Sequence, residues 1–416
     1  MKKKIVILGL CLAFLVRFGV VFWGYHGDLN NNISWAKAAV ERGFNGFYEG
    51  EVWEYSAPNQ PPLTIIIFWF VRLVWQGVND LSWFLNNNFG VFPSSFIWFW
   101  ELKGMILLIK LPCILADFGI GWLIYKFVRK VFGAGEKLAY GMAFLWLFNP
   151  ITMYNSSVWG QTDSVVNFLG LWAILFLLKK DLVRFGVLFG LSILFKGSLV
   201  IFIPILLFVA VKDKFGLANW VKAVGASALV VFVVSFWFHP SWDLPLWLVR
   251  LYNERILPGE IGYLTANAFN FWWLVDSGKV LDSSVYLGLP ARVWGVVVTV
   301  GVNIGLIWWV NKKFGAKRIL MSLVVVALSS FLFMTRIHER YMYPVFPLAT
   351  VLLSVLPSFA VFYVILSLSY LTNMYHLFWV PNLKYVRDLF EMGLSNVLSL
   401  VNLAVLGVFG VKYKNE

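Results

Sequence analysis

Ionisable side chains gather in residues 336–344, which read RIHERYMYP and place two arginines, a histidine and a glutamate within five positions. The segment lies between two apolar runs, 319–334 and 345–356, which are long enough or nearly long enough to cross a bilayer. Charged groups at a membrane boundary are costly unless they face water, a partner or a ligand. We therefore expect a functional cluster here; the alternative is that Arg336 and Arg340 only anchor a helix end among lipid headgroups.

Two further polar motifs interrupt the apolar pattern, WGQTDS at 159–164 and Lys196. Trp159, Gln161 and Asp163 of the first motif are candidate ligand-binding residues. The alternatives are a tryptophan of the membrane interface and an aspartate that caps the next helix. Lys196 either adds a point charge to the site or extends its ammonium group to the headgroups.

The composition is that of a membrane protein with many spans. The chain has 416 residues, of which 60% are hydrophobic and 13% charged, and its mean hydropathy is +0.77. Soluble domains are nearer a quarter charged. No polar stretch is long enough for a separate soluble domain, so we predict one membrane domain over 1–416 with outer loops 24–62 and 239–290.

Apolar runs of about 17 residues or more predict membrane spans. The predicted spans are 5–23, 63–78, 138–154, 163–178, 197–211, 220–238, 291–310, 318–335, 342–356, 359–379 and 395–411. Residues 95–130 form either one tilted helix or two short helices that meet near Pro112, and 184–195 form a short or broken helix. The prediction is fourteen crossings, with twelve as the alternative.

The charge pattern sets the orientation and excludes some functions. The net charge of +13 can suggest nucleic acid, but the basic residues lie in short clusters between apolar runs, as the positive-inside rule expects, so no nucleic-acid partner is predicted. Those clusters are Lys2, Lys3, Lys4; Lys126, Arg129, Lys130, Lys137; Lys179, Lys180, Arg184; Lys212, Lys214; Lys312, Lys313, Lys317, Arg318; and Lys412, Lys414.

With these clusters inside, both termini are cytoplasmic in the plasma membrane, and the polar motifs lie on the extracytoplasmic side. Loop 24–62 has two basic and five acidic residues, and 239–290 has three and five, as expected outside. The inner loops contain no Walker-type phosphate loop, which disfavours an ATP-driven pump or a nucleotide-sugar enzyme. Residues 33–44 are predicted to form an amphipathic surface helix.

In chain order, the motifs resemble a known family. DLNNNISWAKAAVERGFNGFYEG from Asp28, YSAPNQPPL from Tyr55, LIKLPCILADFGIGWLIYKFVRK, NPITMYNSSVWGQTDS, FK at 195–196 and RIHERYMYP resemble bacterial relatives of the GPI-anchor mannosyltransferases, which are membrane glycosyltransferases of the GT-C fold. The resemblance runs from about residue 24 to 345, and WGQTDS and HERYMYP are its specific parts.

The resemblance implies an all-α polytopic membrane protein, a GT-C-type bundle of about 12–14 transmembrane helices with amphipathic helices in the first outer loop. It implies an enzyme that transfers a sugar, mannose or another hexose, from a polyprenyl-phosphate donor. The acceptor would be a glycan, a lipid or a protein on the extracytoplasmic side, in contact with membrane lipids.

The resemblance also implies that an acidic residue early in the first outer loop is the catalytic base, and this residue is Asp28. Burial near lipid is expected to raise the pKa of Asp28 and so its basicity. The alternative is an aspartate that caps a helix at the end of the first span. No second acid follows before Glu41, so a DxD-type metal pair is absent, and neither a divalent metal nor another cofactor is expected.

Glycosyl transfer with inversion also needs groups that stabilise the departing phosphate in a dry site. Arginine forks match phosphate oxygens, so Arg336 and Arg340 are the candidate donor-phosphate ligands, with His338 and Lys196 as further donors. For the sugar that the resemblance implies, Trp159 is the candidate for stacking, and Gln161 and Asp163 are the candidates for binding hydroxyl groups. Tyr341 is a further predicted substrate-binding residue. Glu339 either orients an arginine or only caps it.

Some assignments stay open. Asp117, inside an apolar run, is either a functional carboxylate or the partner of Lys110. His239 has only weak grounds for a place in the site. Loop 239–290 is expected to influence the choice of acceptor. The competing functions are a transporter or flippase of a lipid-linked saccharide, which short broken helices would suit, and a structural membrane scaffold.

Overall fold

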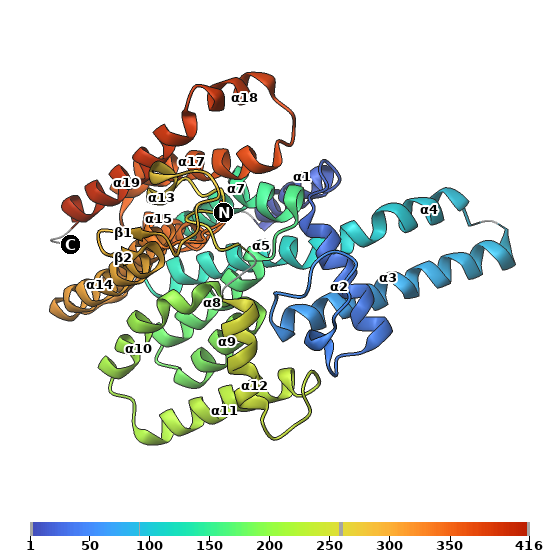
Figure 1. The fold of residues 1–416 in the computed structure, drawn as a ribbon, viewed down its shortest axis with the longest axis horizontal. Helices are drawn as coiled ribbons and strands as arrows, with labels where there is room; N and C mark the ends of the chain where they lie inside the picture. Colours follow the sequence, from blue (N-terminus) through green and yellow to red (C-terminus); the bar gives the residue numbers. More distant parts are fainter. Residues whose placement is uncertain (1–2, 91, 258–260, 414–416) are drawn as a thin grey trace.

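The computed structural model describes residues 3–90, 92–257 and 261–413, so Lys2 and Lys414 of the predicted basic clusters lie outside the described residues. Most of this part of the chain is helical (Figure 1). The first helices are α1 (Lys3–Val20), α2 (Asp28–Arg42), α3 (Pro62–Phe89), α4 (Ser94–Phe99), α5 (Met105–Lys130), α6 (Glu136–Leu147), α7 (Pro150–Met153), α8 (Asp163–Leu178) and α9 (Leu182–Phe195).

The second half continues with helices and one short hairpin. Its helices are α10 (Ile203–Lys212), α11 (Leu217–Ser235), α12 (Leu244–Leu251), α13 (Phe271–Val275), α14 (Ala291–Lys312), α15 (Ala316–Phe333), α16 (Val345–Leu353), α17 (Ala360–Phe378), α18 (Lys384–Glu391) and α19 (Leu394–Tyr413). Strands β1 (Val285–Tyr286) and β2 (Leu289–Pro290) pair antiparallel, with Val285 opposite Pro290.

Among the described residues, seven helices are long and apolar enough to cross a membrane, and three shorter apolar helices accompany them. The seven are Pro62–Phe89, Ser94–Lys130, Leu217–Ser235, Ala291–Lys312, Ala316–Phe333, Pro357–Phe378 and Leu394–Tyr413, and the shorter ones are Asp163–Leu178, Leu182–Phe195 and Gly197–Lys212. The predicted all-α polytopic membrane protein is confirmed, whereas the count of 12–14 crossings stays a prediction.

The two regions with alternative helix predictions, 95–130 and 184–195, differ in the structure. Residues 94–130 form one continuous helix, which passes through a π-helical turn at Trp100–Gly104 and contains Pro112. In contrast, α9 ends at Phe195, and Lys196 adopts an extended backbone before the 3-10 turn Gly197–Phe202 and α10. The broken helix predicted here is confirmed, and the break presents Lys196.

The surface helix begins earlier than residue 33. Helix α2 begins at Asp28, whose carboxylate lies in the first turn and complements the positive end of the helix dipole. Its buried residues include Trp35, Ala36 and Ala39, which pack against α3 in an aromatic-rich cluster with Phe47 and others. Asp28 is therefore a helical residue, and it does not cap the end of the first span.

The described residues of 239–290, a segment predicted to be an outer loop, are folded. This segment contains α12, a π-helical turn at Tyr252–Ile256, α13 and the hairpin. Its strand-like segment lies against the RIHERYMYP motif, where the Ala266 amide donates to the Ile337 carbonyl at 2.9 Å and the Arg336 amide to the Tyr263 carbonyl at 3.2 Å. This docking makes the loop one wall of the site described next.

Candidate active site

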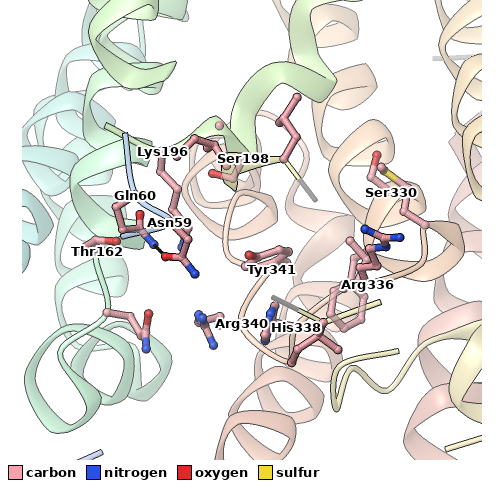
Figure 2. Close-up of a pocket in the computed structure, with 18 of the residues that line it drawn as sticks. Asn59, Gln60, Thr162, Lys196, Ser198, Ser330, Arg336, His338, Arg340 and Tyr341 are labelled. Carbon is pink, nitrogen blue, oxygen red and sulfur yellow. Dashed lines mark hydrogen bonds between the residues drawn. The ribbon is translucent and has the colours of Figure 1, made fainter. Parts of the chain in front are cut away.

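The polar motifs meet at one cavity of about 770 Å³, lined by residues from the helix ends and from loops 24–62 and 239–290. This volume is typical of small-molecule sites. Figure 2 shows Lys196, Asn59, Gln60 and Thr162 on one side, Ser330 and Arg336 on the other, and Tyr341, His338 and Arg340 between them. Seven of the predicted site residues line it, namely Asp28, Gln161, Lys196, Arg336, His338, Arg340 and Tyr341.

Within the described part of the chain, one oxygen of the Asp28 carboxylate is held by hydrogen bonds, and the other is not. Its Oδ2 accepts hydrogen bonds from the Gln161 side-chain amide at 2.5 Å and the Trp159 indole N–H at 3.3 Å. The same oxygen lies 3.9 Å from Arg340 Nη1. Among the described residues Oδ1 has no hydrogen-bond partner, and the side chain is 35% exposed. The carboxylate is therefore oriented with one oxygen free to accept a proton.

The charge environment of Asp28 differs from the sequence-based expectation. Burial alone raises the pKa of Asp28, but the Arg340 guanidinium and hydrogen bonds from His26 and Gln161 outweigh burial and hold the pKa below its usual range. The expectation of a raised pKa is wrong because it considered burial without the neighbouring cation. Asp28 is thus ionised at neutral pH.

Arg340 is the central cation. Its Nη1 donates to Glu339 Oε1 at 2.7 Å, and the Glu339 side chain is fully buried. Of the two roles considered for Glu339, it therefore orients an arginine. Burial lowers the pKa of Arg340, but Glu339 and Asp28 more than compensate, so the net shift is upward. Arg340 keeps a permanent positive charge beside Asp28.

His338 is neutral rather than cationic. Burial, and then the charges of Arg340 and Lys196, lower its pKa well below 6.5. A neutral imidazole still has one N–H to donate. His338 can therefore offer a hydrogen bond to a phosphate, but it brings no charge.

Lys196 and Asp163 form a buried ion pair. Lys196 Nζ lies 2.5 Å from Asp163 Oδ1, and the two side chains are 9% and 5% exposed. Asp163 Oδ2 also accepts from Asn155 Nδ2 at 3.2 Å. Lys196 does not extend to the headgroups, and Asp163 does not cap α8, whose N-cap is Thr162. Lys196 lines the cavity, with Asp163 behind it.

Trp159 lies behind the cavity wall. Its ring is fully buried, and its indole N–H donates to Asp28. It packs against His26, at a centroid separation of 4.7 Å, and Phe378. With no ring face exposed, Trp159 has no surface on which a sugar can stack, and it is not an interfacial tryptophan. Its observed contact is with the candidate base.

Arg336 already has a bidentate partner. Its Nε and Nη2 donate to the two Asp282 oxygens at 2.6 and 3.1 Å, and Thr335 Oγ1 donates to the same carboxylate at 3.1 Å. Asp282 belongs to loop 239–290, so this pair fastens that loop to the RIHERYMYP motif. A bidentate arginine–carboxylate pair is geometrically specific, and it gives Arg336 a positioning task that the sequence did not predict.

Lys110 ties together the two segments that carry Asp28 and its hydrogen-bond donors. Its Nζ donates to the carbonyls of Val21 at 2.7 Å, Gly24 at 3.2 Å and Val158 at 2.7 Å. The first two precede Asp28, and the third precedes Trp159. The predicted Lys110–Asp117 pair does not form, because the ammonium group is saturated by these carbonyls.

Asp117 is bound by other groups. Its oxygens accept hydrogen bonds from Arg17, Ser156, Ser164 and Tyr343, at 3.2, 2.6, 2.7 and 3.1 Å. Arg17 and Asp117 are both completely buried. Of the two readings of Asp117, the structure supports a structural ion pair, but with Arg17 from α1.

Several lining residues were missed from the sequence. Carboxamide side chains form much of one wall, and the far wall includes acidic and basic residues of the outer loop and α14. The missed residues are Asn31, Asn32, Asn59, Gln60, Asp282 and Arg292. Asn31 and Asn32 were detectable in principle, because they follow Asp28 at helical spacing. His239 instead bonds to Asp243 at 2.7 Å and stacks on Trp247.

No group of three or more His, Cys, Asp and Glu side chains that could hold a metal ion occurs in the described part of the chain.

Comparisons with known proteins bear on the family and the fold. Over 201 residues the chain is 27% identical to GPI mannosyltransferase 1 of Saccharomyces cerevisiae; the match covers 48% of this chain and 42% of that protein, less than half of its length. The crystal structure of ArnT from Cupriavidus metallidurans bound to undecaprenyl phosphate matches with a TM-score of 0.53 and 15% identity, over 99% of this chain and 72% of ArnT. At that identity the likeness concerns the fold alone.

The expected GT-C-type fold and the likeness to GPI mannosyltransferases are thereby confirmed. Residues 29–275 match the family described as "GPI transamidase subunit PIG-U", a range that includes Gln161 and Lys196 but neither Asp28 nor the RIHERYMYP motif. Because this match spans more than half of its length, the chain belongs to the family described as GPI transamidase subunit PIG-U.

Proposed function

We propose that this protein transfers a sugar, mannose or another hexose, from a polyprenyl-phosphate donor to an acceptor hydroxyl in the cavity. The observation that carries the proposal is Asp28, a carboxylate with one open oxygen, beside the Arg340 guanidinium in the same cavity. A named relative is a GPI mannosyltransferase, and ArnT was solved with undecaprenyl phosphate. The first name supports the transfer of mannose, and the second supports a polyprenyl-phosphate ligand.

The reaction assigns a role to each side of the cavity. The acceptor oxygen attacks C1 of the donor sugar, the bond from C1 to the phosphate oxygen breaks, and the acceptor proton passes to Asp28 Oδ1. The donor phosphodiester leaves as a polyprenyl phosphate monoester, which gains a second negative charge. Arg340 and Lys196 stabilise that charge, and His338 donates a neutral hydrogen bond.

The same arginine links donor binding to the strength of the base. In the free protein Arg340 lowers the pKa of Asp28. A donor phosphate on Arg340 offsets that positive charge, so the Asp28 pKa rises when the donor is bound. A base whose pKa rises only in the loaded site keeps its charge at rest and gains basicity for transfer.

The remaining site residues position the reacting groups or line the cavity. Gln161 and Trp159 hold Asp28 Oδ2, Asp163 holds Lys196, and Arg336 holds the outer loop. Tyr341 lines the cavity with its ring centroid 5.3 Å from Lys196 Nζ, a cation–π distance. These contacts restrict the movement of the reacting groups.

The cavity is proposed to face the extracytoplasmic side of the plasma membrane, with both termini in the cytoplasm and 1–416 as one domain. Two helices that have one end at the cavity have basic residues at the other. Helix α8 begins at Asp163 and is followed by Lys179 and Lys180; α14 begins near Arg292 and ends at Lys312. By the positive-inside rule, these basic ends support a cavity that faces the extracytoplasmic side.

A second candidate function is favoured by the family description, which names a transamidase subunit rather than a transferase. In that case the same cavity would bind a lipid-linked glycan without breaking a bond. Flipping of a lipid-linked saccharide is a further alternative, which an assay of movement across the bilayer would detect.

The test is a transfer assay in proteoliposomes with radiolabelled polyprenyl-phosphate mannose and an extract of cell-envelope acceptors. Wild type should move the label, and Asp28→Asn should reduce transfer by ~10²–10⁴-fold, the usual contribution of a general base. Asp80→Asn, an exposed aspartate of α3, is the matched control and should keep full activity. Full transfer by Asp28→Asn would contradict the proposal. If wild type binds the donor but the label stays on the polyprenyl phosphate, the binding role is favoured instead.

A further inference from the structure

One face of α2 presents Asp28 together with neutral amides. Asp28, Asn31, Asn32 and Trp35 are spaced i, i+3, i+4 and i+7, which places them on one side of an α-helix, and all four line the cavity. Lys37 on the same helix is exposed to solvent. Of the three consecutive asparagines, Asn31 and Asn32 therefore line the cavity, and Asn30 does not.

A second segment brings two more amides to the same wall. The Trp35 indole N–H donates to the Ser56 carbonyl at 2.8 Å, and the Tyr48 hydroxyl donates to the Gln60 carbonyl at 2.7 Å. These bonds hold Asn59 and Gln60 beside α2, and Figure 2 shows both on the side of the cavity opposite Arg336. Buried aromatic residues thus fix a wall made of polar side chains.

We name this surface the amide wall: Asn31, Asn32, Asn59 and Gln60. Gln60 Nε2 donates to Asn59 Oδ1 at 3.4 Å, but Gln60 Oε1 is buried and has no hydrogen-bond partner among the described residues. A buried amide oxygen without a partner is costly. A ligand hydroxyl could satisfy this oxygen only after the Gln60 side chain moves to expose it, so the proposal rests on Asn31, Asn32 and Asn59, which are partly exposed and line the cavity.

The chemistry of the amide wall selects an uncharged ligand. Each carboxamide offers two N–H donors and an acceptor oxygen, which match the hydroxyl groups of a sugar. The Asp28 carboxylate on the same face of α2 repels anions. Lys196 lies on the same side of the cavity as Asn59 and Gln60 (Figure 2), but it is paired with Asp163 and is proposed to bind the donor phosphate. The basic side chains Arg336 and Arg340 come instead from the RIHERYMYP motif, where the phosphate of the donor is proposed to bind.

We propose that the amide wall is the acceptor subsite and that its ligand is a neutral, polyhydroxylated saccharide, one hydroxyl of which faces Asp28 Oδ1. This inference rests on the proposed function, because it assigns the partner of the same base. It disfavours an acceptor that presents a phosphate or a carboxylate to this wall, beside the Asp28 carboxylate.

The test measures binding to the full chain in lipid nanodiscs with two probes. Octyl α-D-mannopyranoside represents a neutral saccharide, and farnesyl phosphate represents the donor anion. In the double variant Asn31→Leu/Asn32→Leu, the Kd for octyl mannoside should rise at least about tenfold, because hydrogen bonds to two amides are lost. The Kd for farnesyl phosphate should stay unchanged, which also shows that the variant is folded.

Three controls sharpen the experiment. Asn30→Leu changes the neighbouring amide on the same helix and should leave both Kd values unchanged. Asn59→Leu tests the second segment and should weaken only octyl mannoside. Octyl glucuronide, which adds a carboxylate to the sugar, should bind more weakly than octyl mannoside because of Asp28.

The outcomes separate this inference from the proposed function. Unchanged octyl mannoside binding in the double variant, or no saturable binding by wild type, would overturn the acceptor subsite. Loss of binding in the double variant would support it even if wild type transfers no sugar, and in that case only the transferase proposal fails. If wild type transfers sugar and the double variant does so with full activity, the acceptor-subsite inference is wrong and the transferase proposal is unaffected.

Discussion

Asp28 and Asp117 each lie near an arginine, but only one of them has an oxygen to offer. Both oxygens of Asp117 accept hydrogen bonds, two on each, and its side chain is completely buried with Arg17. Asp28 has its hydrogen bonds from Gln161 and Trp159 on Oδ2 alone, and its side chain is 35% exposed. An aspartate and an arginine therefore form a buried structural ion pair in one place and a candidate reaction centre in the other.

The comparison teaches that an ionisable residue in an apolar run is not by itself a functional residue. A carboxylate whose lone pairs are all occupied stabilises the packing of the helices that meet there, here α1, α5 and α8. An open lone pair in a cavity is the more informative signal. The predictions below test this difference.

After Asp28→Asn, the largest effect is expected for Arg340→Gln. Loss of the guanidinium removes the main positive charge at the proposed phosphate, so transfer should fall by ~10²–10³-fold. Initial rates with radiolabelled donor measure the effect, and Arg250→Gln, an exposed arginine of α12, serves as the matched control. An Arg340→Gln variant with near-normal rates would remove Arg340 from the account.

A smaller effect is expected for Lys110→Met. Its ammonium group holds the segments that carry Asp28 and Trp159, so its loss should misplace the base and lower kcat by roughly tenfold to a hundredfold. The KM for donor should change little, because Lys110 is not a lining residue of the cavity. Lys103→Met, exposed on the same long helix, should behave as wild type. A change in KM alone would show that Lys110 acts otherwise.

Tyr343→Phe tests the structural side of the comparison. The Tyr343 hydroxyl donates to Asp117 at 3.1 Å in a fully buried network. Its removal leaves an acceptor less satisfied and should lower the free energy of unfolding by about 1–3 kcal/mol, seen as a lower Tm. Transfer per folded molecule should not change. Tyr385→Phe, at an exposed tyrosine, is the control; equal Tm values for the two variants would contradict the prediction.

The smallest effect is expected from pH. The pKa of Asp28 lies below its usual range and that of His338 well below 6.5. A carboxylate with a lowered pKa stays ionised until the pH falls through that pKa, so neither group changes charge near neutrality. The kcat/KM of wild type should vary by less than about twofold between about pH 6.5 and pH 8. A pH profile of kcat/KM with a midpoint near neutrality would contradict the account if that midpoint disappears in Asp28→Asn.

The sequence predicted the features that depend on local pattern. Apolar runs and basic clusters indicated an all-α membrane protein, and the broken helix at Lys196 followed from the short run before it. The motifs also indicated the residues that meet in the cavity, because Asp28, Gln161, Lys196 and Arg340 each lie just beyond the end of a predicted span.

The missed features are pairings between distant positions. Arg17 meets Asp117 from 100 positions away, and Arg336 meets Asp282 from 54, separations at which no local periodicity operates. The burial of Trp159 and the lowered pKa of Asp28 follow from such pairings as well. Tertiary contacts, not residue types, decide which carboxylate remains open.

The most direct test measures transfer and thermal unfolding together for Asp28→Asn and Asp117→Asn in the same lipid preparation. The account predicts that Asp28→Asn loses transfer and keeps its Tm. It predicts that Asp117→Asn unfolds at a lower temperature, while the fraction that remains folded still transfers sugar. Full transfer by Asp28→Asn, or an inactive Asp117→Asn with an unchanged Tm, would contradict the assignment of the two aspartates.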